Sequence, residues 1–132
     1  MKTSALLTAS AFLLAGCAGS GISVDTLLGT YQGPWTSVTD DGATTLTFQA
    51  DGHVSGQWTD TTTSVTYTVT ESESTVDGLH VLLHMTSSST IGTDEFEGTL
   101  TKNGTHVGGA LTKKVGNAGV LYNVSLDPIP PP

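Results

Sequence analysis

Turn-forming dipeptides recur at short, even intervals after residue 29 and divide the chain into segments of strand length. Five of them combine glycine with aspartate or asparagine, which tolerate the positive φ of tight hairpin turns. These are Asp41-Gly42, Asp51-Gly52, Asp77-Gly78, Asn103-Gly104 and Gly116-Asn117. Two further breaks, rich in polar turn residues, fall at 60–62 and 87–92. Seven turns delimit eight short strands, and this spacing predicts a β-sandwich or a β-barrel.

The segments between the turns alternate apolar and polar residues. Val65, Tyr67 and Val69, for example, are separated by threonines. Successive side chains of a strand point to opposite faces, so each segment has one apolar face and one polar face. The 24 threonines of the chain are β-branched and favour strands. We expect strands at 29–39, 43–50, 53–59, 64–71, 79–86, 93–101, 105–113 and 119–126.

Tight turns join each expected strand to its sequence neighbour, which describes a meander. Closing the meander removes both sheet edges, which would otherwise invite aggregation. The predicted fold class is therefore all-β: an eight-stranded antiparallel up-and-down barrel, favoured over a two-sheet sandwich. Glycines within the strands are expected where a strand bends sharply. They are Gly33, Gly56, Gly98, Gly108 and Gly109.

Residues 1–16 have the pattern of a cleaved secretory signal peptide: Lys2, an apolar run and then small residues. The sole cysteine, Cys17, ends the sequence LLAGC, which resembles the lipobox of bacterial lipoproteins closely. The resemblance implies cleavage before Cys17 and attachment of lipid to it. The alternative is an ordinary signal peptide with a chance cysteine. Several acyl chains together anchor a protein stably, so the resemblance implies a membrane partner.

The lipoprotein resemblance also implies a location in the bacterial cell envelope. Ala18 follows the cysteine where an aspartate would signal inner-membrane retention in enteric bacteria, so we expect the outer membrane, facing the periplasm or the cell surface. Residues 17–28 form the lipidated cysteine and a tether, whose apolar end could make a short turn or helix that plugs the domain. The apolar residues are Ile22, Val24, Leu27 and Leu28. The barrel domain covers 29–126, and 127–132 is a proline-rich tail without regular structure.

The charge of the chain argues against nucleic acid as a partner. Its formal net charge is −8, which becomes −9 when Lys2 leaves with the signal peptide, and all four basic residues are lysines. Phosphate binding needs clustered Lys and Arg, which are absent from this sequence. The acids are dispersed and are typical of a soluble surface.

The stretch LLGTYQGPW, residues 27–35, resembles the first strand of calycin-type barrels. Gly33, Pro34 and Trp35 match the Gly-x-Trp of lipocalins, and Gly29, Thr30 and Tyr31 approach the Gly-Thr-Trp of avidins. The later segments FQADGHVSGQW and FEGTLTKNGTHVGGALT resemble the hairpins of small calycin-like proteins. The likeness covers most of 27–126 and implies a calycin-like barrel. A lipocalin disulfide and a tryptophan-rich biotin pocket are not matched, so no retinoid or biotin site is carried over.

Seven aromatic residues fall on the faces that alternation assigns to the barrel interior, and they are the candidate ligand-binding residues. Small-molecule sites are mostly apolar and aromatic, so these side chains could line a pocket. The alternative, a packed core, is favoured, since a small domain must bury its large residues to fold. The seven are Tyr31, Trp35, Phe48, Trp58, Tyr67, Phe96 and Tyr122.

No residue spacing points to catalysis, a metal or another cofactor, and we do not expect an enzyme. His80 and His84 share the outer face of a strand but lie about 13 Å apart, too far for one ion. The acids at 94–97 lack the loop pattern of a calcium site, and Glu95 and Glu97 are expected to face water. The serines are not in Gly-x-Ser-x-Gly.

Two functions remain for an anchored barrel of this kind. One is a binding module that holds a small apolar or amphipathic ligand against the aromatic set. The alternative is a protein-interaction module with a filled core, such as an envelope accessory or a periplasmic inhibitor, whose acidic surface suits a basic partner. In either case we expect the site at the end of the barrel away from the tether. That end carries the turns near 40–42, 60–62, 87–92 and 115–118.

Overall fold

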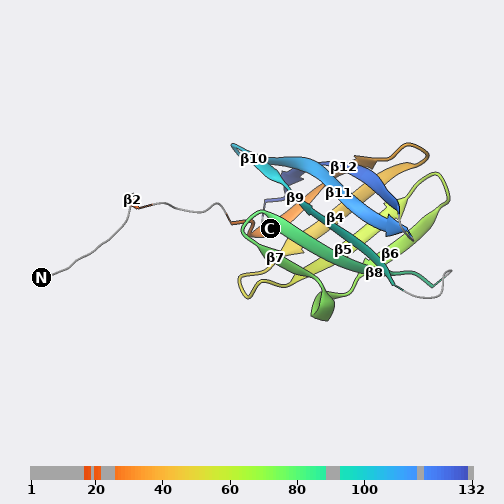
Figure 1. Cartoon of the computed structure of the whole chain (residues 1–132), viewed down its shortest axis with the longest axis horizontal. Coiled ribbons are helices and arrows are strands. Elements are labelled where there is room, and N and C mark those ends of the chain that lie inside the picture. Colours follow the sequence, from red (N-terminus) through yellow and green to blue (C-terminus); the bar gives the residue numbers. More distant parts are fainter. Residues whose placement is uncertain (1–16, 19, 22–25, 89–92, 116–117, 131–132) are drawn as a thin grey trace, which may run out of the picture.

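The computed structural model of the chain describes residues 17–18, 20–21, 26–88, 93–115 and 118–130, and these form an all-β structure (Figure 1). The predicted signal peptide, 1–16, lies outside the described residues, as do Ile22 and Val24 of the tether. No described segment is a helix long and apolar enough to cross a membrane.

Eight antiparallel strands close into a barrel, which confirms the predicted fold class. Each barrel strand pairs with the next, and β12 returns to β3 through pairs such as Val124 with Trp35. The closed ladder leaves no free barrel edge among the described strands. The barrel strands are β3 (Gly29–Thr36), β4 (Asp41–Phe48), β5 (Val54–Asp60), β6 (Val65–Val69), β8 (His80–Thr86), β9 (Asp94–Thr99), β11 (His106–Val115) and β12 (Ala118–Pro128).

Short elements decorate the barrel where the sequence predicted a simple turn or one continuous strand. The connection after β6 contains a 3-10 turn, η1 (Glu71–Glu73), and a strand, β7 (Thr75–Asp77), which pairs with β8. The strand expected over 93–101 divides into β9 and β10 (Thr101–Asn103) at Leu100. Leu100 is buried, and its N–H donates to the carbonyl of Leu79, so the chain bends there to fill the barrel. In the tether, β1 (Cys17–Ala18) pairs with β2 (Ser20–Gly21).

The last strand runs two residues past its predicted end at 126. Asp127 pairs with Gln32, and Pro128 pairs with Tyr31. The expectation that regular structure ends before Asp127 is therefore wrong. The N–H of Ile129 points towards β3 and donates to Thr30 O. Because successive N–H groups of a strand point to opposite sides, an N–H at residue 128 would point away from β3. The strand on that side, β11, starts at His106 and does not extend alongside residue 128, so a proline there removes no hydrogen bond from the ladder.

The barrel interior is filled by the apolar faces that the alternation predicted. Each large side chain removed from water contributes about 1.5–3 kcal/mol, so this core is the main stabilising element of the fold. Neighbouring outward positions carry mainly threonine and other polar residues. The core residues are Leu27, Tyr31, Trp35, Leu46, Phe48, Val54, Trp58, Val69, Val76, Val81, Leu83, Met85, Phe96, Leu100, Val107, Leu111, Val124 and Leu126.

Gly56 shows why a barrel this small needs glycine within its strands. Its φ is +145°, and a Cβ atom there would lie 2.1 Å from the carbonyl oxygen of Thr45 on β4. The neighbouring backbone occupies the space of a side chain because the sheet coils sharply at this point. Gly33 of β3 has the same role against Ser125 O, at 1.9 Å.

The two ends of the barrel differ in what closes them (Figure 1). At the near end, where β3 starts, Leu27 is fully buried and its N–H donates to Gly78 O. Of the two leucines in the predicted plug, Leu27 is buried and Leu28 is 54% exposed. Residues 26–28 form neither a helix nor a turn. The far end carries the β3–β4 and β5–β6 turns at 37–40 and 61–64, as the order of turns predicted.

Candidate functional site

All seven candidate aromatic side chains point into the barrel, but they form two groups. Tyr31 and Phe48 lie in the near half and make an edge-to-face contact with ring centroids 5.7 Å apart. In the far half, Trp35 and Trp58 are stacked at 5.0 Å with an interplanar angle of 21°. Tyr67 pairs with Trp58 across the β5–β6 ladder.

Tyr122 and Phe96 complete the far aromatic group. The Tyr122 ring lies 5.3 Å from that of Trp35 and 6.0 Å from that of Trp58. Phe96 lies 5.2 Å from Trp58 and 5.0 Å from Tyr122. Trp35 also donates its indole N–H to Thr59 O at 3.1 Å. Aromatic pairs of this kind contribute about 0.5–1.5 kcal/mol beyond area burial, so these contacts stabilise the far half of the core.

Exposure rises from the indoles towards the far end. Trp35 and Trp58 are 1% and 2% exposed, whereas Tyr67 and Tyr122 are only partly buried. Neither phenol hydroxyl of these tyrosines forms a hydrogen bond within the described part of the chain. A buried Tyr hydroxyl usually has a partner, so these two present polar atoms with unused hydrogen-bonding capacity beside aromatic surface.

Three carboxyl groups stand around the tyrosines at the far end. Asp60 ends β5, is 7% exposed and accepts hydrogen bonds from the N–H groups of Thr62 and Thr63 at 2.9 and 3.1 Å. Asp40 precedes β4, and its carboxyl group interacts with that of Asp60. Asp94 begins β9. We call Asp40, Asp60, Asp94, Tyr67 and Tyr122 the far-end rim.

The rim groups influence one another electrostatically. Interaction with the Asp60 carboxyl group raises the pKa of Asp40, and burial and the Asp60 charge raise it further. Burial raises the pKa of Tyr67, and the charges of Asp94, Asp60 and Asp40 add to it. Burial followed by the same three charges raises the pKa of Tyr122. An anionic rim disfavours further negative charge, and it therefore favours a cation.

Lys113 offsets part of the rim charge. Its ammonium lies 3.4 Å from Asp94 and 5.9 Å from the centre of the Phe96 ring. The protein thus already places one cation against a carboxylate and an aromatic face at this end.

Three cavities lined by described residues lie on the outer surface and at the near end. A groove of about 430 Å³ on the outer wall is lined by Gln32, Gly33, Pro34, Ala43, Thr44, Thr45, Asp127 and Pro128. A smaller one of about 100 Å³ adjoins it across β4 and β5. Neither is lined by the aromatic set, whose indoles pack ring against ring below the rim.

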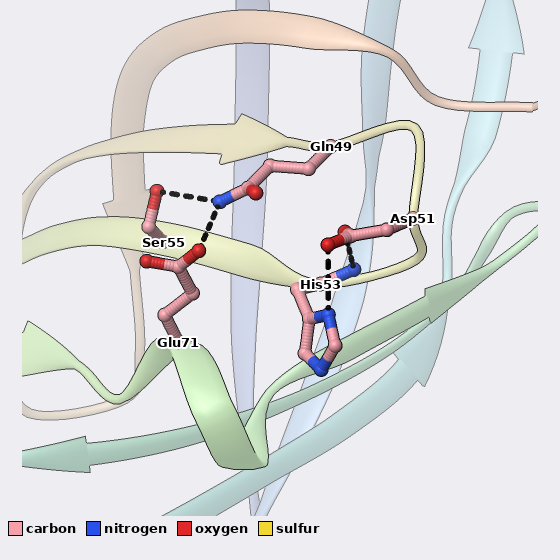
Figure 2. A network of polar contacts seen from close by, with 5 residues as sticks. All are labelled: Gln49, Asp51, His53, Ser55 and Glu71. Atoms are coloured by element: carbon pink, nitrogen blue, oxygen red, sulfur yellow. Dashed lines mark hydrogen bonds and ion pairs between the residues drawn. The ribbon is translucent and has the colours of Figure 1, made fainter.

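A third hollow, of about 520 Å³, lies at the near end between the β4–β5 turn and η1. Figure 2 shows the polar contacts beside it. Gln49 Nε2 donates to Glu71 at 2.9 Å, and His53 Nδ1 lies 3.2 Å from Asp51. The backbone N–H of His53 also donates to Asp51, and this bond lowers the pKa of that carboxyl group. The Gln49–Glu71 bond joins the turn to η1, and the Asp51–His53 contacts lie within the turn.

The histidines and acids of the outer wall do not converge on a metal. His80 contacts Glu97 at 2.8 Å and Thr99 at 3.0 Å, whereas His84 Nδ1 contacts the carbonyl of Glu73. Within the described residues no group of three His, Cys, Asp or Glu could hold a metal ion. Cys17 lies in β1, and its side chain is outside the description, so its lipidation stays a prediction.

Sequence reasoning missed two polar arrangements. The Asp40–Asp60 pair joins two turns. Its sequence signal is Asp60-Thr-Thr-Thr, which is typical of an Asx-turn, at a position two residues after Trp58 and therefore on the same inward face of the strand. The second is a network on the outer wall, where Ser125 contacts His106 at 3.2 Å and His106 contacts Asp127 at 3.0 Å. Its signal is the dipeptide Gly116-Asn117 in the sequence, and the β11–β12 register pairs Val115 with Ala118.

Comparisons with protein-family models, with curated proteins and with solved structures gave no match to this chain.

Proposed function

We propose that the protein is a lipoprotein of the bacterial envelope whose calycin-like barrel binds an amphipathic ligand with a positive charge at the far-end rim. The observation that carries this proposal is the pair of partly buried tyrosines with unbonded hydroxyls beneath three carboxyl groups. An apolar body would lie on the rings, and a cationic head would lie among the carboxylates. Cations over aromatic faces gain about 0.5–2 kcal/mol.

The filled interior supports a site at the rim. Trp35, Trp58 and Phe96 contact one another directly, so a ligand that enters deeply must displace packed rings. A ligand at the rim needs only to cover Tyr67 and Tyr122, which are already partly exposed. Trp58 contacts Tyr122 and therefore reports on occupancy through its fluorescence.

Titration with alkyl ligands of one chain length tests the proposal. We expect an alkyltrimethylammonium, below its micelle concentration, to change the tryptophan fluorescence saturably, and an alkyl sulfate not to. Asp94→Asn should weaken the binding about tenfold, whereas Asp77→Asn at the near end should leave it unchanged. Equal affinity for cationic and anionic ligands, or no saturable signal, would contradict the proposal.

A protein partner is the second candidate, favoured by exposed apolar side chains near the same end. Val38, in the β3–β4 turn, is 90% exposed, and Leu121 of β12 is 57% exposed. Flanked by Asp40 and Asp41, this surface suits a basic partner with an apolar contact, such as lysozyme. An inhibition and binding assay against lysozyme and proteases tests it. Val38→Asp should abolish an inhibition that Leu28→Asp at the near end leaves intact.

The anchor is a separate part of the proposal and has its own test. Cys17→Ser should release the protein from membranes without changing the fold, because residue 17 precedes the barrel. Fractionation shows the release, and the near-ultraviolet circular dichroism of the barrel tryptophans serves as the control. Cys17→Ser protein that stays in the membrane fraction would contradict lipid attachment at this residue.

A further inference from the structure

The longest ladder of the barrel places a serine, a histidine and an aspartate together on the outer wall. Val107 pairs with Leu126, and Gly108 pairs with Ser125. Val107 and Leu126 are fully buried, so His106, Ser125 and Asp127 point outward. Ser125 and Asp127 lie two residues apart on β12, and therefore on one face. The near part of β11 brings His106 to both.

The contacts assign the two ring nitrogens of His106 to different partners. Its Nδ1 lies 3.0 Å from Asp127 Oδ1, and its Nε2 lies 3.2 Å from Ser125 Oγ. An ionised carboxylate can only accept hydrogen bonds, so Nδ1 of His106 carries the hydrogen and donates it to Asp127. In the neutral ring Nε2 is then the acceptor and faces the serine hydroxyl. This is the order of contacts by which a base activates a serine nucleophile.

The other described histidines lack this order. His80 also touches an acid and a hydroxyl, but its ring is reversed, with Nε2 on Glu97 and Nδ1 on Thr99. His80 and His106 side chains are 47% and 46% exposed, so the two imidazoles are equally accessible to solvent. His80 therefore provides a control within the same barrel wall.

A groove on the outer wall adjoins this network at Asp127. Gly108 lies opposite Ser125, and a Cβ atom there would make only ordinary van der Waals contact with His106 Nε2, at 3.5 Å. The groove of about 430 Å³ begins at Asp127 and crosses Pro34 and Ala43. Gln32 lines the groove opposite Asp127 and brings a side-chain amide to this face as a hydrogen-bond donor for a carbonyl oxygen.

We propose that Ser125, His106 and Asp127 form a hydrolytic centre for carboxylic esters, separate from the far-end rim. Ser125 Oγ attacks the ester carbonyl carbon while its proton passes to His106 Nε2. Collapse breaks the bond to the alcohol, which leaves with that proton, and an acyl ester remains on Ser125. Water then attacks the acyl group, again giving a proton to Nε2. The second collapse returns this proton to Ser125 Oγ and releases the carboxylic acid. Asp127 is a positioning residue that holds the Nδ1–H.

Covalent labelling of the purified full-length protein tests the centre. A fluorophosphonate should phosphonylate Ser125, which peptide mapping by mass spectrometry identifies, and Ser125→Ala should remove the adduct. His106→Gln should slow labelling and p-nitrophenyl acetate hydrolysis at least ~100-fold. Asp127→Asn should slow both with little change in KM, and Asp127→Glu should restore part of the rate.

The matched controls are His80→Gln and Thr99→Ala, which alter the reversed arrangement and should leave both rates unchanged. All five side chains lie on the outer wall, so near-ultraviolet circular dichroism of the variants should match the parent protein. Three results would overturn the proposal: no adduct on Ser125, labelling unaffected by His106→Gln, or ester hydrolysis by Ser125→Ala at the parental rate, which would reflect imidazole alone.

Discussion

At the scale of single residues, alternation along a strand decides which side chains enter the barrel. It predicted inward positions for Trp35, Trp58 and Phe96, which are buried. The same parity puts Asp60 inside, two residues after Trp58. A carboxylate is acceptable there because Asp60 lies at the barrel end, where two backbone N–H groups donate to it. That compensation depends on the turn conformation and cannot be predicted from alternation alone.

Trp58→Ala tests the burial assignment. The side chain is 2% exposed and contacts three aromatic rings, so its removal should lower the free energy of unfolding by about 3–5 kcal/mol. Thr68→Ala on the outer face of β6 should cost within about 0.5 kcal/mol. Urea denaturation of both variants gives the comparison, and a larger cost at Thr68 would reverse the assigned faces.

Asp40→Asn tests the paired carboxyl groups through pH. The native state raises the pKa of Asp40 above 3.8, so it binds that proton more readily than the unfolded chain does. Stability from this group is therefore present at low pH and is lost as pH rises through the native pKa. We expect Asp40→Asn to be more stable than the parent protein at pH 7, and the difference to shrink towards pH 4.

Asp51→Asn is the control with the opposite sign. Its pKa is lowered by the N–H of His53, so its stabilisation is present at neutral pH and is lost in acid. Thermal denaturation at pH 7, 5 and 4 should show this variant less stable than the parent protein at pH 7 and approaching it at pH 4. Parallel pH profiles for the two variants would rule out the Asp40–Asp60 pair.

At the scale of elements, the spacing of the turn signals predicted the eight barrel strands, but the expected turn at Asp41-Gly42 is wrong in place, because both residues begin β4 and the turn lies at 37–40. Tertiary contacts added the remaining elements. The segment 71–77 contains no hairpin signal before Asp77, yet it forms η1 and β7 because Val76 packs inward and β7 pairs with β8. The Ser125 network is also a product of pairing, since His106 lies nineteen residues from Ser125 along the chain. Sequence patterns describe each strand separately, whereas the pairing register between strands decides which side chains of two strands become neighbours.

Gly56→Ala tests the coiling that closes the barrel. The substitution places a Cβ atom 2.1 Å from a β4 carbonyl and also demands a positive φ. We expect a loss of about 3 kcal/mol or more, as a rigid backbone must move. Gly104→Ala is the control, because its φ is +65° with open space around it, and it should cost about 1–2 kcal/mol. Equal losses of stability in the two variants would show that the positive φ, and not the close backbone approach, accounts for the need for glycine at position 56.

At the scale of the whole molecule, the meander sorts every turn to one of two ends. Counting turns from β3 predicted which loops lie away from the start of the barrel, and Figure 1 agrees for 37–40 and 61–64. The identity of a ligand could not be predicted in this way, because the rim combines groups from four strands, β5, β6, β9 and β12, and from the β3–β4 turn. The proposed rim and the proposed ester site consequently lie towards opposite ends of one barrel, with His106 next to the β10–β11 turn.

This separation gives a prediction with two opposite readouts. A bulky, flexible insertion after Ser88 should block cation binding at the rim and leave labelling of Ser125 intact. The same insertion after Asn103 lies three residues from His106, and it should slow labelling while tryptophan fluorescence still reports ligand binding. Both positions are exposed and lie outside the core, so each variant should retain the barrel. If the Asn103 insertion alone abolished cation binding, the ligand site would have to lie at the near end, because an inserted loop blocks only a site close to it.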